Sequence, residues 1–357
     1  MKLLMIKKRG YFVFWAVMLL SHMLLINNIC AQTYGTQYIS YASNTTEDYN
    51  VYLQNTNGEN LRLLTNHPTN EKDLTWSPDG RFLAYTSNQE GTYKIYVLDT
   101  RTAEHWRLTN LDEREWTPAW SPDGKWIAFV SGNQEFIPGV KIEITSDIYK
   151  ADINGAHLVQ LTDKGTNVGP SWSPDSQRIA FVSYHRGNER KGIYVMDADG
   201  RRLRRINDKE VQALDGIIQS ECAWSPDGKQ IAFSMVVPRD ERMHLYVIDI
   251  DGKNFRQLTQ GPPMLGNKDG ARSPEIRQPA WSPNGKWIAY VFENTPGNAD
   301  IYVIDAMGNG RGKPLVKDGG RDLSPAWVPE GFLSVSPSEE QQTTLWCRLK
   351  QETNTTK

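Results

Sequence analysis

The chain has 357 residues, of which 39% are hydrophobic and 10% aromatic, and it carries 28 Gly and 19 Pro. This composition excludes a disordered chain, because so many apolar side chains need a core. The 40 Lys and Arg nearly balance the 42 Asp and Glu, and the formal net charge of −2 excludes a polyanion-binding protein of the histone kind. We therefore predict a folded protein with no nucleic-acid partner.

Residues 1–31 have the pattern of a secretory signal peptide. An uncharged apolar run over 11–26 is preceded by four basic residues and followed by a small one: Lys2, Lys7, Lys8, Arg9 and Ala31. A retained membrane anchor and a lipoprotein modified at Cys30 are the alternatives. In each case the rest of the chain leaves the cytoplasm. We expect a periplasmic or secreted protein that contacts the membrane only through this segment.

Three strand-like segments follow, over 38–43, over 50–54 and in a run that ends at Leu64-Thr65. They are short and rich in β-branched and aromatic residues, and turn residues bound them. This pattern is typical of β-strands.

From residue 76 onward the sequence repeats. The motif is Trp-Ser-Pro-Asp-Gly with small changes, and its copies begin at Trp76, Trp120, Trp172, Trp224, Trp281 and, as Trp-Val-Pro-Glu-Gly, at Trp327. Two apolar runs follow each of the first five copies, such as 82–85 and 95–99. A short segment comes next, and in several units it ends in Leu-Thr, as at 108–109 and 258–259. Four strands in a period of about 50 residues predict an antiparallel meander, and meanders at this spacing form the blades of a β-propeller.

The two ends of the repeat complete one blade. Residues 38–65 supply three strands with no Trp strand before them, and residues 324–327 supply the missing one. We therefore predict an all-β fold: a six-bladed β-propeller of four-stranded antiparallel blades over 32–331, closed by a composite blade from both termini, with a tail over 332–357. Such closure leaves no open sheet edge. The alternative is seven blades, with residues 332–349 supplying strands of the seventh.

The repeat resembles the TolB-type, or WD40-like, β-propeller repeat over about residues 38–330. TolB, the non-catalytic propellers of prolyl-oligopeptidase-like peptidases and many stand-alone exported proteins share it, so the resemblance implies the fold and no single function. TolB has an α/β domain before its propeller, and the peptidases have a hydrolase domain after theirs. We expect neither domain here, which argues against a Tol–Pal role and against catalysis by a hydrolase domain.

No catalytic or metal-binding motif stands out. The sequence lacks Gly-x-Ser-x-Gly, His-Glu-x-x-His, P-loop and Cys-x-x-Cys motifs, and its histidines are scattered over different repeat units. The Ser-Pro-Asp-Gly segments are expected to be tight turns, and the Asp-x-Asp-Gly segments hairpin turns, since a calcium loop needs further ligands. The Trp residues are expected to pack between blades. We predict no enzyme activity, no cofactor and no metal site.

In a meander, the long connections over 132–145, 207–220 and 260–278 fall on the face where the Trp strands begin, around the channel. Variable loops on a repeated scaffold are where recognition usually resides. We predict that a protein, peptide or glycan partner binds there to a monomeric propeller, in contact with Arg114, Glu115, Glu221, Arg277 and Asp322. With Glu71 and Asp73, these residues make a mixed but mostly acidic ring.

Three alternatives stay open on the sequence alone. The charges of the ring can be ordinary solvated loop charges. The runner-up function is a hydrolase or lyase, with charged residues of the ring as acid and base in the channel. The third is an accessory propeller that gates access to a separate peptidase.

Overall fold

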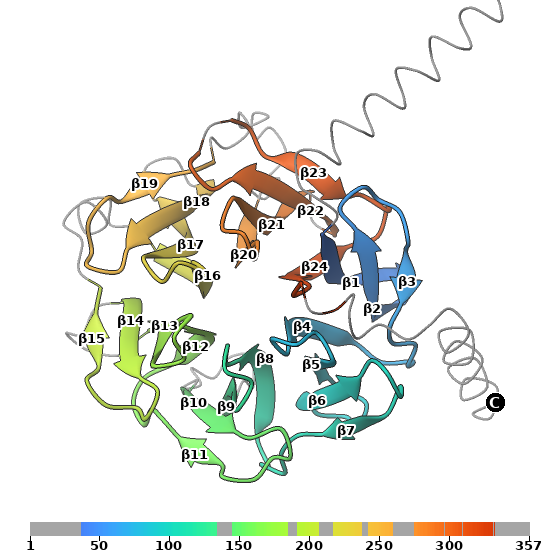
Figure 1. Ribbon diagram of the computed structural model, residues 1–357, viewed down its shortest axis with the longest axis horizontal. Helices are drawn as coiled ribbons and strands as arrows, with labels where there is room; N and C mark the ends of the chain where they lie inside the picture. The colour runs from blue at the N-terminus through green and yellow to red at the C-terminus, as the bar shows by residue number, and fades with distance from the viewer. Residues whose placement is uncertain are drawn as a thin grey trace, which may run out of the picture.

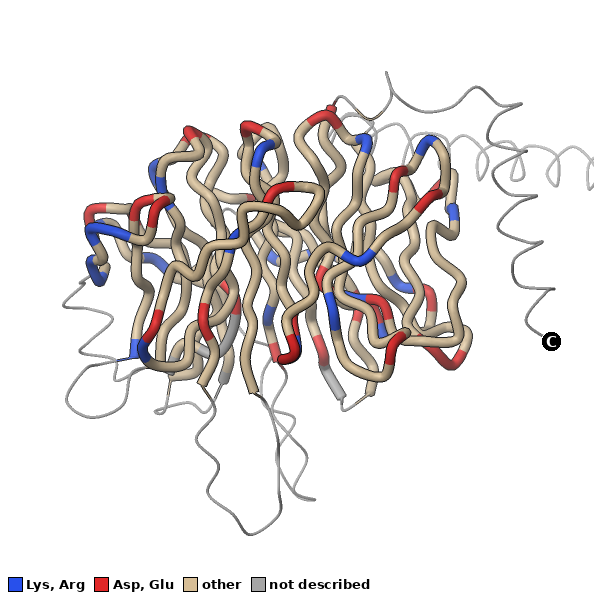
Figure 2. Tube along the Cα trace, turned by 90° about the horizontal axis from the view of Figure 1, so that it is seen from below, with Lys and Arg blue, Asp and Glu red and all other residues tan. Residues whose placement is uncertain are grey.

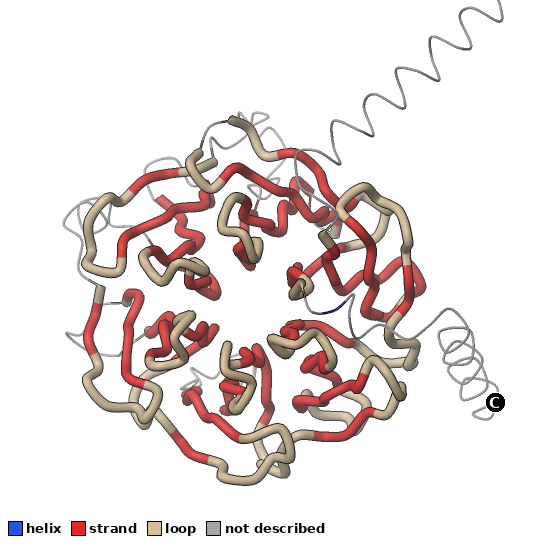
Figure 3. The backbone as a smooth tube through the Cα atoms, in the orientation of Figure 1, coloured by secondary structure: helices blue, strands red, loops and turns tan. Residues whose placement is uncertain are grey.

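The computed structural model describes residues 37–133, 145–184, 191–206, 217–237, 242–259, 275–295, 297–308, 310–330 and 332. In these residues, six four-stranded antiparallel sheets surround a central channel (Figure 1). Strands joined by turns make up the whole ring (Figure 3). The predicted signal peptide over 1–31, and the tail beyond Phe332, lie outside the described residues.

Each blade runs outward from an inner strand at the channel to a short outer strand. From inside to outside, the composite blade consists of β24 (Asp322–Trp327), β1 (Tyr38–Thr46), β2 (Asp48–Asn55) and β3 (Arg62–Leu63). Blades 1 and 2 consist of β4 (Glu71–Trp76), β5 (Phe82–Ser87), β6 (Lys94–Asp99) and β7 (His105–Arg107), and of β8 (Arg114–Trp120), β9 (Ile127–Asn133), β10 (Thr145–Ala151) and β11 (Val159–Gln160). Blade 3 consists of β12 (Asn167–Trp172), β13 (Arg178–Ser183), β14 (Gly192–Asp197) and β15 (Arg204–Arg205). Blades 4 and 5 consist of β16 (Ile217–Trp224), β17 (Gln230–Val237), β18 (Arg242–Asp249) and β19 (Arg256–Gln257), and of β20 (Glu275–Trp281), β21 (Trp287–Thr295), β22 (Asn298–Asp305) and β23 (Lys313–Val316).

The ring closes as predicted. Strand β24 pairs antiparallel with β1, with Ile39 opposite Trp327 and Ser43 opposite Asp322. Because β24 lies between β20 and β4 around the channel, six blades complete the circle (Figure 1). Phe332 packs at the seam between the composite blade and blade 1, with its ring centroid 5.4 Å from that of Trp76. The alternative of a seventh blade is therefore wrong, and the remaining residues assigned to it lie outside the described part of the chain.

The Ser-Pro-Asp-Gly segments are tight turns, as expected. In blade 1, Ser77 Oγ donates to Asp79 Oδ1 at 2.6 Å, and the backbone N–H of Phe82 donates to Ser77 Oγ at 2.8 Å. Gly80 has a φ of 70°, a conformation that glycine adopts without a steric penalty. The same bonds recur in blades 2 to 5. The Asp of each of these turns, or Asn284 in blade 5, therefore stabilises the turn.

The Trp residue that ends each inner strand packs between two blades, as predicted. Trp224, for example, belongs to one apolar cluster with Val195 and Ile206 of blade 3 and Ile231 of its own blade. Three of the indoles also donate a hydrogen bond to a backbone carbonyl of the preceding blade: Trp172 to Ala119 at 3.0 Å, Trp281 to Ala223 at 3.1 Å and Trp327 to Ala280 at 3.0 Å. The repeated Trp is therefore an anchor between blades.

The two faces of the ring are built differently. The Ser-Pro-Asp-Gly turns lie on one face, which we call the turn face. On the other face, Glu71 at the start of β4 is level with Ser87 and Lys94, where β5 ends and β6 begins. We call this the mouth face. Charged residues lie along both faces (Figure 2). Of the predicted long connections over 132–145, 207–220 and 260–278, residues 134–144, 207–216 and 260–274 lie outside the described residues, and the rest belong to strands β9, β10, β16 and β20.

Candidate binding site at the channel mouth

Every inner strand has an irregularity in its pairing shortly before its Trp. Five of the residues three positions before the Trp have a φ between 47° and 60°: Asp73, Thr117, Gly169, Gln278 and Ser324. Four of the five are not glycine, and backbone strain of this kind is commonly kept at functional sites. A bulge turns a strand locally and re-aims its side chain. Glu221 occupies the corresponding position before Trp224 in blade 4.

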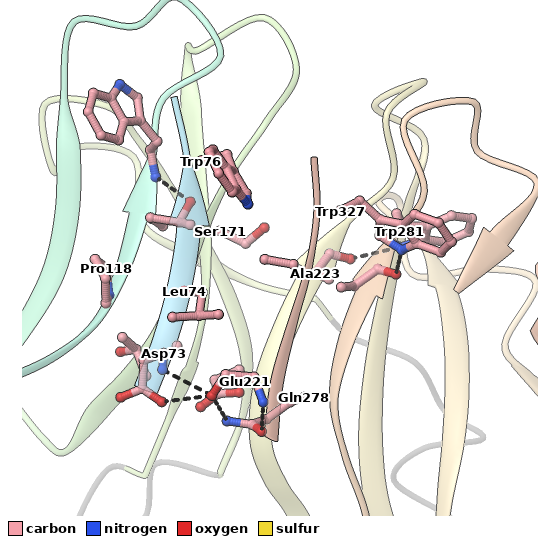
Figure 4. A pocket seen from close by; sticks show the side chains of 18 of the residues that line it. Asp73, Leu74, Trp76, Pro118, Ser171, Glu221, Ala223, Gln278, Trp281 and Trp327 are labelled. Atoms are coloured by element: carbon pink, nitrogen blue, oxygen red, sulfur yellow. Dashed lines mark hydrogen bonds between the residues drawn. The ribbon is translucent and has the colours of Figure 1, made fainter. Parts of the chain in front are cut away.

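These six residues line the channel together, and we call them the collar. On the side of the Trp residues lies a central cavity of about 340 Å³, lined by the collar and by Pro, Ala and Trp side chains of the inner strands. Figure 4 shows Asp73, Glu221 and Gln278 at one end of this cavity and Trp76, Trp281 and Trp327 toward the other. The inner strands thus give the channel a polar end and an apolar end.

Hydrogen bonds connect the collar around half of its circumference. Ser324 Oγ accepts from the backbone N–H of Asp73 at 3.0 Å, and Gln278 Oε1 accepts from the backbone N–H of Ser324 at 2.9 Å. Gln278 also bonds the side chain of Glu221. Burial, and then the charge of Asp73, raise the pKa of the Glu221 carboxyl above its usual range, while Gln278 and Arg277 oppose the shift. The acidic groups of Asp73 and Glu221 thus line one cavity, which no sequence motif had predicted.

A second cavity, of about 330 Å³, lies on the mouth side of the collar. We call it the mouth cavity. Its charged lining residues are Lys72, Asp73, Arg114, Glu221, Arg277 and Arg321, and Tyr93 and Trp116 are its aromatic ones. The structure therefore brings together three of the residues that the sequence pointed to, Arg114, Glu221 and Arg277.

The cations of the mouth cavity are held in place by neighbours. Arg277 Nη1 is 3.0 Å from Glu275 Oε2, and the other end of its guanidinium bonds Glu293 Oε2. Arg321 Nη2 lies 3.0 Å from the same Glu293 oxygen. The ammonium of Lys72 lies 4.4 Å from the ring centroid of Tyr93, a cation–π contact.

The structure corrects the prediction for Glu115 and Asp322, which are fully buried and do not face the mouth. They lie five residues before the Trp of their strand, whereas the cations of the inner strands lie four or six residues before it. Because side chains alternate across a strand, the two sets point to opposite sides. The expected mostly acidic ring is therefore wrong, since four cations and two acids line the mouth cavity.

Glu115 connects two neighbouring blades. Glu115 accepts hydrogen bonds from Thr109 Oγ1 and, at 3.2 Å, from the backbone N–H of Ile95 in blade 1, and it lies 3.8 Å from Lys94 Nζ. Burial, partly opposed by these bonds, raises the pKa of the Glu115 carboxyl. Thr109 belongs to the recurrent Leu-Thr segment, and Glu115 follows it six residues later. This spacing of a Thr and an acid was the sequence signal that could have indicated a structural role.

Glu71 repeats this arrangement at the next junction. It accepts hydrogen bonds from Thr65, Thr69 and Ser87 at 2.7 to 3.2 Å. Burial raises the pKa of its carboxyl to about 7, although the three bonds oppose the shift.

Sequence reasoning also missed Lys72, Arg321, Tyr93 and Trp116. These residue types are common at protein surfaces. Only their position, on the channel side of an inner strand or next to it, identifies them as lining residues of the mouth cavity. Among the described residues, no three or more His, Cys, Asp or Glu side chains gather where a metal ion could be held. No helix in that part of the chain has the length and apolar character needed to cross a bilayer.

Comparison with known proteins gives the family. The model of the TolB beta propeller domain matches residues 26–212, more than half of the chain. The chain belongs to the TolB β-propeller family. A model of the N-terminal region of dipeptidyl peptidase IV matches residues 171–268.

Two curated relatives have TolB names. The protein TolB homolog of Chlorobium luteolum is 27% identical over 166 residues, which cover 46% of this chain and 32% of that protein. The Tol-Pal system protein TolB of Francisella tularensis is 27% identical over 227 residues, which cover 52% of this chain and 49% of that protein. This TolB-family chain thus spans about half or less of the length of these relatives.

Solved structures agree on the fold. TolB from Acinetobacter baumannii superposes with a TM-score of 0.64 at 22% identity, over 86% of this chain and 71% of that one. The oligogalacturonate lyase of Vibrio parahaemolyticus superposes with a TM-score of 0.53 at 16% identity, over 78% and 74% of the two chains. A TolB protein and a lyase thus share this scaffold, and the likeness concerns the fold alone.

Proposed function

We propose that this TolB-family propeller is an exported, non-enzymatic and monomeric scaffold of the cell envelope that binds a protein partner at its channel mouth. The observation that carries the proposal is the mouth cavity, where anchored cations and two aromatic side chains meet at the edge of a strained collar. Concave sites with a few oriented polar groups are where ligands usually bind. The relatives named as Tol-Pal system proteins support a role among other proteins. A glycan is the other occupant to be tested.

The test is site-specific photo-crosslinking of the full chain in the cells that produce it. A crosslinking amino acid replaces Leu323, which lines the mouth cavity, or Asp227, which lies exposed in a turn on the turn face. We expect a discrete protein adduct in the envelope fraction from position 323 and none from position 227. Adducts from the turn face alone, or retention of the protein in the cytoplasm, would contradict the proposal.

The second candidate function is a hydrolase or lyase. The observation in its favour is that Asp73 and Glu221 line the same cavity while the pKa of Glu221 is raised, as general acids require. Incubating the purified chain with mixed peptides and oligogalacturonates, followed by mass spectrometry, tests it. Products that disappear in the Glu221→Gln variant would establish catalysis in place of a scaffold role.

A further inference from the structure

We propose that the segment received by the mouth cavity is acidic, with a carboxylate held among Lys72, Arg114 and Arg277. The inference rests on the proposed function and names the chemistry of its partner. The mouth cavity thus differs from the mostly acidic ring expected from the sequence, which would have attracted a basic segment.

The first argument is the division of charges by the pleat of the inner strands. Glu71 and Glu115, five residues before their Trp, are buried and accept hydrogen bonds from the neighbouring blade. Positions four and six residues before the Trp supply Lys72, Arg277, Arg114 and Arg321, all of which line the mouth cavity. The charged residues that line the cavity are therefore mainly cations, two of which, Arg277 and Arg321, are paired with Glu275 and Glu293.

The second argument is that two guanidiniums are already oriented. Glu293 Oε2 accepts from both Arg277 and Arg321, and Glu293 Oε1 accepts from the backbone N–H of Gly297 at 3.0 Å. Each guanidinium has five N–H donors, and only part of them is used in these bonds. An arginine held in this way loses little rotamer entropy when it binds a carboxylate in a forked geometry.

The third argument concerns Glu221, which opposes an anionic guest less than an ordinary glutamate would. Glu221 lies in the collar, below the cations, where burial and the neighbouring Asp73 raise the pKa of its carboxyl. It is thus less charged near neutral pH than an ordinary glutamate. The carboxylate of Asp73 lies in the same collar, with Ser324 Oγ 3.5 Å from its Oδ1. Arg114 and Arg321 lie farthest from both acids along the strands, and Arg114 is exposed.

The size and the walls of the mouth cavity indicate an extended segment. A volume of about 330 Å³ accommodates a few side chains and no folded domain. Tyr93, beneath the Lys72 ammonium, and Trp116 offer apolar surface beside the cations. Aromatic side chains next to arginines are the groups that dominate binding energy at protein interfaces. A short peptide with a carboxylate next to an apolar residue matches this wall.

The experiment is selection of peptides from an unbiased random phage library on the immobilised full chain. Peptides whose binding is abolished by the double variant Lys72→Glu/Arg114→Glu are sequenced, and we expect a clear excess of Asp and Glu. Binding of a selected peptide, measured by fluorescence anisotropy, should weaken at least tenfold in that variant, the equivalent of about 1.4 kcal/mol. It should change less than twofold in the matched variant Lys229→Glu/Lys253→Glu, which alters two exposed cations of the turn face, roughly the scatter expected of an uninvolved charge.

The outcomes separate the two proposals. Selected peptides that compete at the mouth but are neutral or basic overturn the acidic segment and leave the scaffold proposal standing. An oligogalacturonate that binds in their place, with the same loss in the double variant, overturns the peptide in favour of an acidic glycan. If position 323 yields no adduct and no selected peptide depends on Lys72 and Arg114, both proposals fail.

Discussion

The buried carboxyl of Glu71 makes the stability of the blade junction depend on pH. Its pKa rises from 4.5 in an exposed glutamate to about 7 in the folded chain, chiefly because of burial. A carboxyl with a raised pKa holds its proton more tightly in the folded state than in the unfolded state. Its contribution is therefore complete below pH 4.5 and is lost as the pH rises through 7.

The magnitude follows from the shift of the pKa. A shift of about 2.5 units at roughly 1.4 kcal/mol per unit makes the wild type lose about 3 kcal/mol of unfolding free energy between pH 4.5 and pH 8 through this one residue. The Glu71→Gln variant cannot ionise. Its carbonyl oxygen can still accept from Thr69 and Ser87, whereas its amide group has to donate to Thr65 Oγ1 in place of accepting from it. We therefore expect it to match the wild type near pH 4.5 and to be more stable at pH 8.

Urea unfolding of both proteins, followed by tryptophan fluorescence over this pH range, measures the difference. The Glu59→Gln variant, at an exposed position of the composite blade, is the control and should follow the wild-type curve. The reasoning would be refuted if the Glu71→Gln variant were less stable than the wild type at pH 8, or if the difference in unfolding free energy between the two proteins did not change with pH. Such a result would mean that the three hydrogen bonds to the ionised carboxylate outweigh its burial.

Two further predictions concern the packing between blades. The Trp172→Phe substitution removes an indole that donates a hydrogen bond to a backbone carbonyl of blade 2. Trp120→Phe removes an indole whose Nε1 is buried without a partner among the described residues. In thermal or urea unfolding, Trp172→Phe should therefore lower the free energy of unfolding by about 1 kcal/mol more than Trp120→Phe. Equal costs would show that the indole bond contributes nothing. The Phe332→Ala substitution empties the seam beside Trp76 and should cost about 3 kcal/mol, while the exposed Met307→Ala should be neutral; a neutral Phe332→Ala would mean that β24 alone closes the ring.

Much of the fold could be predicted from the sequence, because the repeat places one Trp, one turn and four short strands in each unit. Each blade must bury apolar side chains against the next blade, and the same residue type does so at Trp120, Trp172 and Trp224. Closure was readable too, since the three unaccompanied strands before Trp76 needed the strand at 322–327 to cover an edge. Local patterns determine these features, and six copies repeat the signal.

The residues of the candidate site could be predicted only in part. The sequence located the starts of the inner strands, and Arg114, Glu221 and Arg277 do line the mouth cavity. It did not tell which side of the strand each charge would take, so that Glu115 and Asp322 were misplaced. Neighbouring charges look alike in a sequence, whereas in a strand one enters the junction between blades and the next enters the channel.

By itself, then, the sequence determined the four-stranded blade and the face on which the inner strands begin, because these depend on local periodicity. It favoured six blades over seven, and the closed ring decided the number. Only the tertiary structure decided the sign of the charge at the mouth and the composition of the collar. The reason is that pleat and bulge act through pairing with a partner strand. A bulge at Asp73 or Gln278 turns a side chain toward the channel axis, and burial against the next blade converts an acid such as Glu71 into a structural bond.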